Sequence, residues 1–181
     1  EADAFPSDKY AVESQLRHHG LDDKEGLILW KSRDNEELAN YEDLKAILQE
    51  QGDKIALIMI GGVNYYTGQF FDLKRITDLG HSHGCTVGFD CAHGAGNVQL
   101  NLHNSGADFA VWCTYKYLNS GPGSLSGAFV HERHARRKDL NRFTGWWSHN
   151  KETRFRMRDE FDQLPGAEGW QLSNPPILSM A

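Results

Sequence analysis

The sequence predicts a three-layer α/β/α domain built on a mostly parallel sheet. Helical and strand-like segments alternate along the chain, and the strand-like segments are continuous apolar runs rather than alternating ones. Such runs are typical of strands that helices cover on both faces, as in parallel sheets. The 181 residues, 39% of them hydrophobic and 24% charged, suffice for one domain of this kind.

The first part of the chain predicts two helices and two strands. Residues 9–20 carry apolar side chains at helical spacing and end in a glycine, which predicts a helix. The short apolar run at 27–32 predicts a strand, and residues 35–52 predict a second helix that again ends at a glycine. Residues 54–64 are long and β-branched apolar residues, so we expect a strand covered on both faces.

The middle of the chain continues this alternation. Residues 72–84 predict an amphipathic helix, 85–90 a strand, 97–106 a short helix or turn, and 108–115 a third buried strand. A glycine-rich stretch then precedes the strand-like residues 127–132, so we expect the chain to reverse there. The pattern indicates βαβ units.

The last part of the chain differs in character. Charged residues dominate 133–158 with aromatic residues between them, which predicts a surface excursion with an apolar underside that can serve as an interface. We expect a partial domain over 1–170 and an exit segment, 171–181, that leads toward a missing C-terminal domain. Because the chain begins without Met in a loop-like stretch, we expect it to be a fragment.

Composition argues against several classes of protein. The net charge is −6 with scattered basic residues, so we expect no nucleic-acid binding, and no apolar run is long enough to cross a membrane. Cys85, Cys91 and Cys113 lack CxxC spacing and suggest reduced thiols in a cytosolic protein. His131 and His134 are three apart rather than four, so we expect no metal site of the HExxH kind, and no metal elsewhere.

Two reactive side chains follow neighbouring apolar strands. In open α/β sheets ligands bind beyond the carboxyl ends of the strands, where Asp90 and Lys116 stand in this sequence. A buried carboxylate needs a cation or hydrogen-bond donors, and a buried amine becomes a nucleophile toward carbonyls. Pyridoxal 5'-phosphate explains both residues, because it needs a lysine for its aldehyde and an acid beside its ring nitrogen.

Structural roles for the same residues stay open at this stage. Asp90 can cap the segment that follows it, and Lys116 can be a surface lysine after a strand. Tyr115 can be a core aromatic residue, and His93 can hydrogen-bond the glycine turn beside it.

Six motifs, in the same order along nearly the whole chain, resemble the kynureninase family: GVNYYTGQFFDL, FDCAHGAGN, DFAVWCTYKYLNSGPGS, GAFVHERHA, GWWSHN and LSNPPI. YKYLNSGPG is the most specific of them. The resemblance implies a fold-type-I enzyme with an aminotransferase-like large domain and pyridoxal 5'-phosphate as cofactor. It also implies hydrolysis of L-kynurenine or 3-hydroxy-L-kynurenine to anthranilate or 3-hydroxyanthranilate and L-alanine, in the tryptophan catabolism that leads to NAD biosynthesis.

The resemblance also implies roles for individual residues. Lys116 would hold the cofactor as a Schiff base, Asp90 would pair with the pyridine nitrogen, and Tyr115 would bind the phosphate and transfer protons; these three are the expected catalytic residues. The full cofactor-binding set that it implies is Phe5, Pro6, Ser7, Asp8, Gly61, Asp90, His93, Tyr115, Lys116, Trp146 and Asn174.

Within that set, Phe5 would stack on the pyridine ring, Asp8 would add a second carboxylate, and His93 would contact the cofactor. Trp146 and Asn174 would complete the pocket, reaching the active site of a neighbouring subunit, so the resemblance implies a homodimer. The cysteine pattern, separately, predicts a cytoplasmic location.

The sequence departs from the family pattern at one position and lacks two expected elements. Gly61 stands where the family has a small hydroxyl residue, so one phosphate contact is lost or passes to the backbone. An earlier phosphate-binding segment and the arginine that binds the substrate carboxylate are absent. Two rivals therefore remain: another fold-type-I enzyme, such as a cysteine desulfurase or an aminotransferase, and a truncated non-catalytic scaffold.

Overall fold

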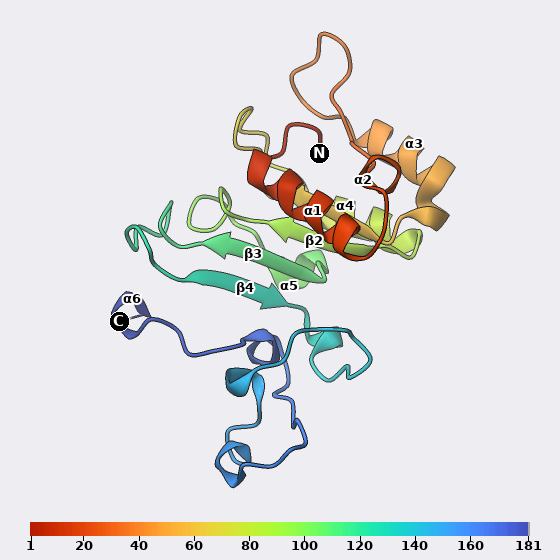
Figure 1. The fold of residues 1–181 in the computed structure, drawn as a ribbon. Helices are drawn as coiled ribbons and strands as arrows, with labels where there is room; N and C mark the ends of the chain where they lie inside the picture. Colours follow the sequence, from red (N-terminus) through yellow and green to blue (C-terminus); the bar gives the residue numbers. More distant parts are fainter. Residues whose placement is uncertain (181) are drawn as a thin grey trace.

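The computed structural model describes residues 1–180 and is built on one four-stranded sheet (Figure 1). The strands lie in the order β1-β2-β3-β4, the order of the sequence. β1, β2 and β3 are parallel, and β4 pairs antiparallel with β3. Their bounds are β1 (Leu57–Gly61), β2 (Thr86–Asp90), β3 (Phe109–Cys113) and β4 (Ser126–Val130). The predicted α/β fold with a mostly parallel sheet is confirmed, as is the reversal of the chain before β4.

Helices α3 (Tyr41–Gln51) and α4 (Leu73–Ser82) supply much of the apolar core against the sheet. Gly80 explains how closely α4 approaches the strands, because a Cβ there would lie 2.6 Å from Val87 and 2.8 Å from Ile58. Most of the buried apolar residues form one cluster of Trp30, Leu44, Leu48, Ile58, Ile60, Phe71, Leu73, Ile76, Cys85, Val87, Phe89, Cys91, Ala107 and Ala110.

The remaining helices of this region lie at its periphery. α1 (Pro6–His18) buries none of its residues and passes in front of β2 in Figure 1, and α2 (Asp23–Gly26) follows it. The short η1 (Gly52–Lys54) extends α3, and α5 (Leu102–Ser105) precedes β3. Pro6 occupies the first position of α1, where its missing N–H costs no hydrogen bond, so the helix begins three residues before the predicted start.

The strand predicted over 27–32 is wrong. This run has no strand partner; its anchor is Trp30, which is buried against Tyr41 and Phe71. The Trp30 indole N–H donates to the Asn40 carbonyl at 3.0 Å, while Ile28 in the same run is 40% exposed, so one buried side chain, and not strand pairing, anchors this run.

The second predicted helix is shorter than the pattern over 35–52 suggested. It begins at Tyr41 because the side chain of Asn40 accepts a hydrogen bond from the Glu42 N–H at 2.9 Å and caps the first turn.

The chain after β4 forms an extension with little regular structure, drawn in blue below the sheet in Figure 1. It contains η2 (Glu132–His134), η3 (Trp146–Ser148), η4 (Arg154–Arg156), η5 (Ala167–Trp170) and α6 (Ile177–Met180). Phe143, Phe155 and Met157 are 75–81% exposed, so several apolar side chains of the predicted surface excursion face outward. The boundary between 1–170 and 171–181 stays a prediction.

A buried carboxylate ties the amino-terminal end of β3 to its neighbours. Asp108 accepts hydrogen bonds from the Val87 N–H and His81 at 2.8 Å, and from Arg133 and His134 at 2.7 Å. Burial alone would raise the pKa of the Asp108 carboxyl, but the hydrogen bonds from His134, His81, Val87 and Arg133 outweigh it and hold that pKa well below its usual range. Three separate segments are thus joined at one side chain.

Within residues 1–180, no helix is both long and apolar enough to cross a membrane. The same residues hold no group of three or more His, Cys, Asp or Glu side chains suited to a metal ion.

Candidate active site

Loops from the carboxyl ends of three parallel strands meet the start of α1 around Lys116. The Lys116 amine lies 2.9 Å from Nε2 of His93 and 5.6 Å from the centroid of the Phe5 ring. We call this group of side chains the Lys116 cluster: Phe5, Asp8, Tyr65, Asp90, His93 and Lys116. Its members come from segments that are far apart in the sequence, and parallel strands bring them together because all their carboxyl ends lie at one edge.

Two carboxyl groups of the cluster, Asp8 and Asp90, interact directly. The pKa of Asp8 is raised to about 7, first by burial and then by the hydrogen bond and charge of Asp90, with a smaller contribution from Glu1; the charge of Lys116 opposes the shift. At neutral pH the Asp8 carboxyl is therefore only partly ionised, and a positive group placed beside it would favour the loss of its proton. This is the electrostatic setting that suits a cationic ring nitrogen.

Asp90 also shapes the turn after β2. Its Oδ1 accepts a hydrogen bond from the Ala92 N–H at 2.8 Å, which is the capping contact expected of an aspartate that ends a strand. The structural role considered for Asp90 thus exists beside its place in the cluster.

His93 points its ring at the lysine. Burial and the neighbouring charge of Lys116 lower the pKa of His93, whereas Asp90 acts in the opposite direction. A neutral imidazole accepts a proton in a hydrogen bond, so Lys116 donates to Nε2 of His93. The ring contact therefore goes to Lys116 and not to the glycine turn.

A row of aromatic rings runs along the cluster. Tyr65 meets Phe5 edge to face at 5.3 Å and 89°, its ring lies 6.5 Å from that of His93, and His93 lies 6.0 Å from Tyr117. Sequence reasoning did not single out Tyr65 or Tyr117. Their positions held a signal, since Tyr65 closely follows β1 and Tyr117 stands directly after Lys116.

Among the described residues, no recorded hydrogen bond joins the Tyr115 hydroxyl to the Lys116 amine. Its side chain is about half exposed, and a hydrogen bond with Cys113, followed by the Cys113 charge, raises the pKa of its phenol. Its catalytic role stays a prediction.

Gly61 presents its backbone N–H to an anion. The N–H donates to a carboxylate oxygen of Glu1 at 3.1 Å, and a Cβ at Gly61 would lie 3.1 Å from the other oxygen of the same group. The same N–H could donate to a phosphate oxygen in place of the Glu1 carboxylate.

The other predicted residues divide by location. Pro6 and Ser7 form the first turn of α1 next to Phe5 and bring Asp8 into the cluster. Trp146 packs against Phe155 in the extension after β4. Among the described contacts, none joins Trp146 or Asn174 to the Lys116 cluster, so their roles stay predictions.

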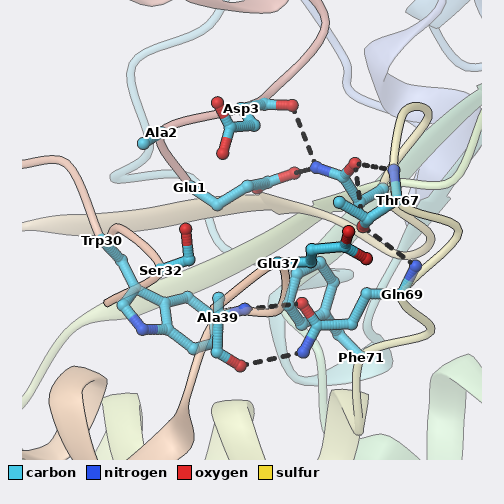
Figure 2. A pocket seen from close by; sticks show the side chains of 11 residues that line it. Glu1, Ala2, Asp3, Trp30, Ser32, Glu37, Ala39, Thr67, Gln69 and Phe71 are labelled. Carbon is cyan, nitrogen blue, oxygen red and sulfur yellow. Dashed lines mark hydrogen bonds between the residues drawn. The ribbon is translucent and has the colours of Figure 1, made fainter. Parts of the chain in front are cut away.

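The Lys116 cluster lies outside both of the cavities described in the structure. The first, of about 10 Å³, has room for roughly one water molecule. It is lined by Glu1, Ala2, Asp3, Trp30, Ser32, Glu37, Ala39, Asn64, Thr67, Gln69 and Phe71 (Figure 2). The second, an open groove of about 440 Å³, includes Tyr41, Phe70, Leu73, Leu100 and Asn104.

Replacing Asp8 with asparagine should remove a pH dependence of stability. Between the ordinary pKa of 3.8 and about 7, the folded protein keeps a proton on Asp8 that the unfolded chain releases, so rising pH favours unfolding. We expect the stability of the cofactor-free protein to fall less over this window in Asp8→Asn than in wild type. Urea unfolding at pH 5 and pH 8 measures the difference, with Asp3→Asn as the control; equal slopes in all three proteins would contradict the assignment.

The amino-acid sequence of this chain is similar to that of known proteins. A model of the aminotransferase class-V family matches residues 20–134. The chain is 60% identical over 181 residues to a kynureninase from Myxococcus xanthus, covering all of this chain and 42% of that protein. A kynureninase from Mus musculus is 52% identical over 178 residues, or 98% of this chain and 38% of that protein. The chain thus spans about two fifths of the length of these relatives.

Solved structures share the fold at low sequence identity. A cysteine desulfurase from Thermococcus onnurineus NA1 superposes with a TM-score of 0.66 and 17% identity, covering 94% of this chain and 39% of that one. A cysteine desulfurase from Escherichia coli has a TM-score of 0.57 and 20% identity, covering 75% of this chain and 32% of that one. At these identities the likeness concerns the fold alone.

Proposed function

Because the chain belongs to the aminotransferase class-V family, we propose that it is the cofactor-binding core of a kynureninase. The reaction is the hydrolysis of L-kynurenine or 3-hydroxy-L-kynurenine to anthranilate or 3-hydroxyanthranilate and L-alanine. The observation that carries this proposal is the 60% identity to a kynureninase over all 181 residues, far above the 17% identity to a cysteine desulfurase of similar fold.

Pyridoxal 5'-phosphate is the cofactor of this family, and the cluster suits its chemistry. Lys116 would hold its aldehyde carbon, the Asp8–Asp90 pair would receive the ring nitrogen, and Phe5 offers a flat surface beside the lysine. The Gly61 N–H and Tyr115 are candidates for the phosphate. When bound, the cofactor supplies a protonated ring that withdraws electrons from the substrate carbons next to the amine.

The side chains of the cluster then divide the proton transfers. A neutral Lys116 amine, once free, is the base for the Cα proton of the substrate and returns that proton later. His93 accepts a hydrogen bond from the Lys116 amine. This contact would hold the amine nitrogen in place after it has taken up the proton. Asp90 would pair with the ring nitrogen, and we assign Tyr115 the role of proton donor to the carbon that leaves the ketone.

Trp146 and Asn174 enter the proposal as residues that serve a neighbouring subunit. The family resemblance supports this assignment, because it implies a homodimer in which both residues reach the active site of the partner subunit. A cytoplasmic location and a place in tryptophan catabolism are parts of the same proposal.

Substrate turnover separates the proposal from its rivals. The full-length protein is given L-kynurenine or L-cysteine, and fluorescent anthranilate or sulfide is measured. We expect anthranilate only. Sulfide release would favour a cysteine desulfurase and overturn the proposal.

Cofactor trapping tests the alternative of a non-catalytic scaffold. Borohydride reduction in the presence of pyridoxal 5'-phosphate, followed by peptide mapping, should label the peptide that contains Lys116. A protein that is folded yet carries no label, and that releases no anthranilate, would be the scaffold.

A further inference from the structure

The loop after β1 places Tyr65 against the two rings nearest the reactive lysine. Tyr65 meets Phe5 edge to face at 5.3 Å, and its ring lies 6.5 Å from His93. Phe5 and His93 are the rings that approach the Lys116 amine, at 5.6 Å and 2.9 Å. Tyr65 therefore lies against both rings that border the amine, although Phe5 precedes α1 and His93 follows β2.

Hydrogen bonds hold this loop and the segment carrying Phe5 together. Asn64 is buried, and its Oδ1 accepts from the N–H groups of Tyr66 and Thr67, both at 2.9 Å. Its Nδ2 donates at 2.9 Å to the carbonyl of Asp3, two residues before Phe5. Figure 2 shows Asp3 and Thr67 on the same small pocket, where dashed hydrogen bonds join the two segments. Asn64 thus holds both the loop that carries Tyr65 and the segment that carries Phe5, and so fixes the position of one ring relative to the other.

The ring of Tyr65, and not its hydroxyl, makes these contacts. Among the described residues, the structure records no hydrogen bond to the Tyr65 phenol oxygen. Tyr66 follows Tyr65 in the sequence and is 80% exposed, and the centroids of the two rings are 6.2 Å apart. Tyr66 is therefore a matched residue of the same type that lies outside the contact with Phe5.

We propose that Tyr65 is a positioning residue that fixes Phe5 and His93 beside Lys116, and thereby sets the plane in which the cofactor ring is held. This inference rests on the proposed function, because it assigns Phe5 to the ring of pyridoxal 5'-phosphate. Tyr65 acts through Phe5 and His93 rather than by touching the reacting atoms.

Four variants of the full-length protein test the proposal: Tyr65→Ala, Tyr65→Phe, Tyr66→Ala and Phe5→Leu. The dissociation constant of pyridoxal 5'-phosphate is measured by quenching of protein fluorescence, and the tilt of the bound ring is followed by circular dichroism in its visible absorption band. An edge-to-face pair has a free energy that corresponds to about three- to tenfold in binding. We expect Tyr65→Ala to weaken binding by about that factor and to change the dichroism.

The controls separate ring packing from general damage. Tyr65→Phe keeps the ring and should restore both readouts, and Tyr66→Ala should leave both unchanged. In the double variant of Phe5→Leu and Tyr65→Ala the loss should be smaller than the product of the single losses, because the two residues act through one contact.

Two outcomes overturn the proposal, and they differ from failure of the proposed function. A wild-type protein that binds no pyridoxal 5'-phosphate overturns the function and this inference with it. A wild type that binds, together with an unaltered Tyr65→Ala or a Tyr65→Phe as weak as Tyr65→Ala, overturns the inference alone. If Tyr65→Ala proves unstable by thermal melting, Tyr65→Leu carries the test, since it fills the space without a flat ring.

Discussion

On the proposed function, replacing Lys116 with alanine in the full-length protein should reduce the turnover of L-kynurenine by about a thousandfold or more, because the residue assigned as both nucleophile and base has no substitute nearby. The structure offers the reason. Lys116 holds the amine of the cluster, and its contact partners are an imidazole and a phenyl ring that cannot form the same bond to an aldehyde.

Anthranilate fluorescence measures the turnover number of the variant, and thermal melting shows that it remains folded. Lys45→Ala on the exposed side of α3 is the control and should keep wild-type turnover. Added methylamine should restore part of the activity of Lys116→Ala, since it replaces the missing amine. A Lys116→Ala variant that retains more than about a tenth of the activity would show that another residue carries the chemistry.

Replacing Asp108 with alanine should lower the free energy of unfolding by about 3–5 kcal/mol, the usual effect of breaking a buried charged network. The change removes four hydrogen bonds at once and leaves Arg133 and His134 facing an empty site. The loss affects His134 most, because its Nδ1 is already buried without a hydrogen-bond partner among the described residues.

Asp108 should also make the stability of the folded protein fall in acid. Its pKa is lowered in the folded protein, so its contribution is present above the ordinary value of 3.8 and is lost as the pH falls toward the folded pKa. Asp108→Ala should lack this acid-dependent component. Urea unfolding from pH 3 to 7 measures both effects, with Asp78→Ala as the control, since its exposed pair with Lys74 contributes at most about 0.5 kcal/mol. Equal stabilities of the two variants would contradict the role of Asp108.

The elements that the sequence predicted correctly are those with strong local patterns. The apolar run that contains β1 and the amphipathic helix α4 have patterns that local burial produces, and the structure has them where expected. The strand prediction at 27–32 failed because one buried side chain, here Trp30, can anchor an apolar run that has no strand partner. Apolar content reports burial, and burial alone does not distinguish a strand from an anchored loop.

The location of Asp90 and Lys116 at one edge of the sheet was predictable for a related reason. Asp90 and Lys116 follow apolar strands, and the order of parallel strands brings their carboxyl ends to one edge whatever the details of packing. Asp8 was expected beside them only through the family resemblance. Neither source predicted that its pKa rises to about 7, which depends on burial and on the distance to Asp90.

The sequence by itself determined the order of the four sheet strands along the chain and the ionisable groups that follow their carboxyl ends, because these follow from local patterns and chain direction. Only the tertiary structure decided that Tyr65 meets Phe5 and that four donors converge on Asp108. Contacts of this kind join residues far apart in the chain, and their geometry depends on how the intervening segments pack, so no local pattern encodes them.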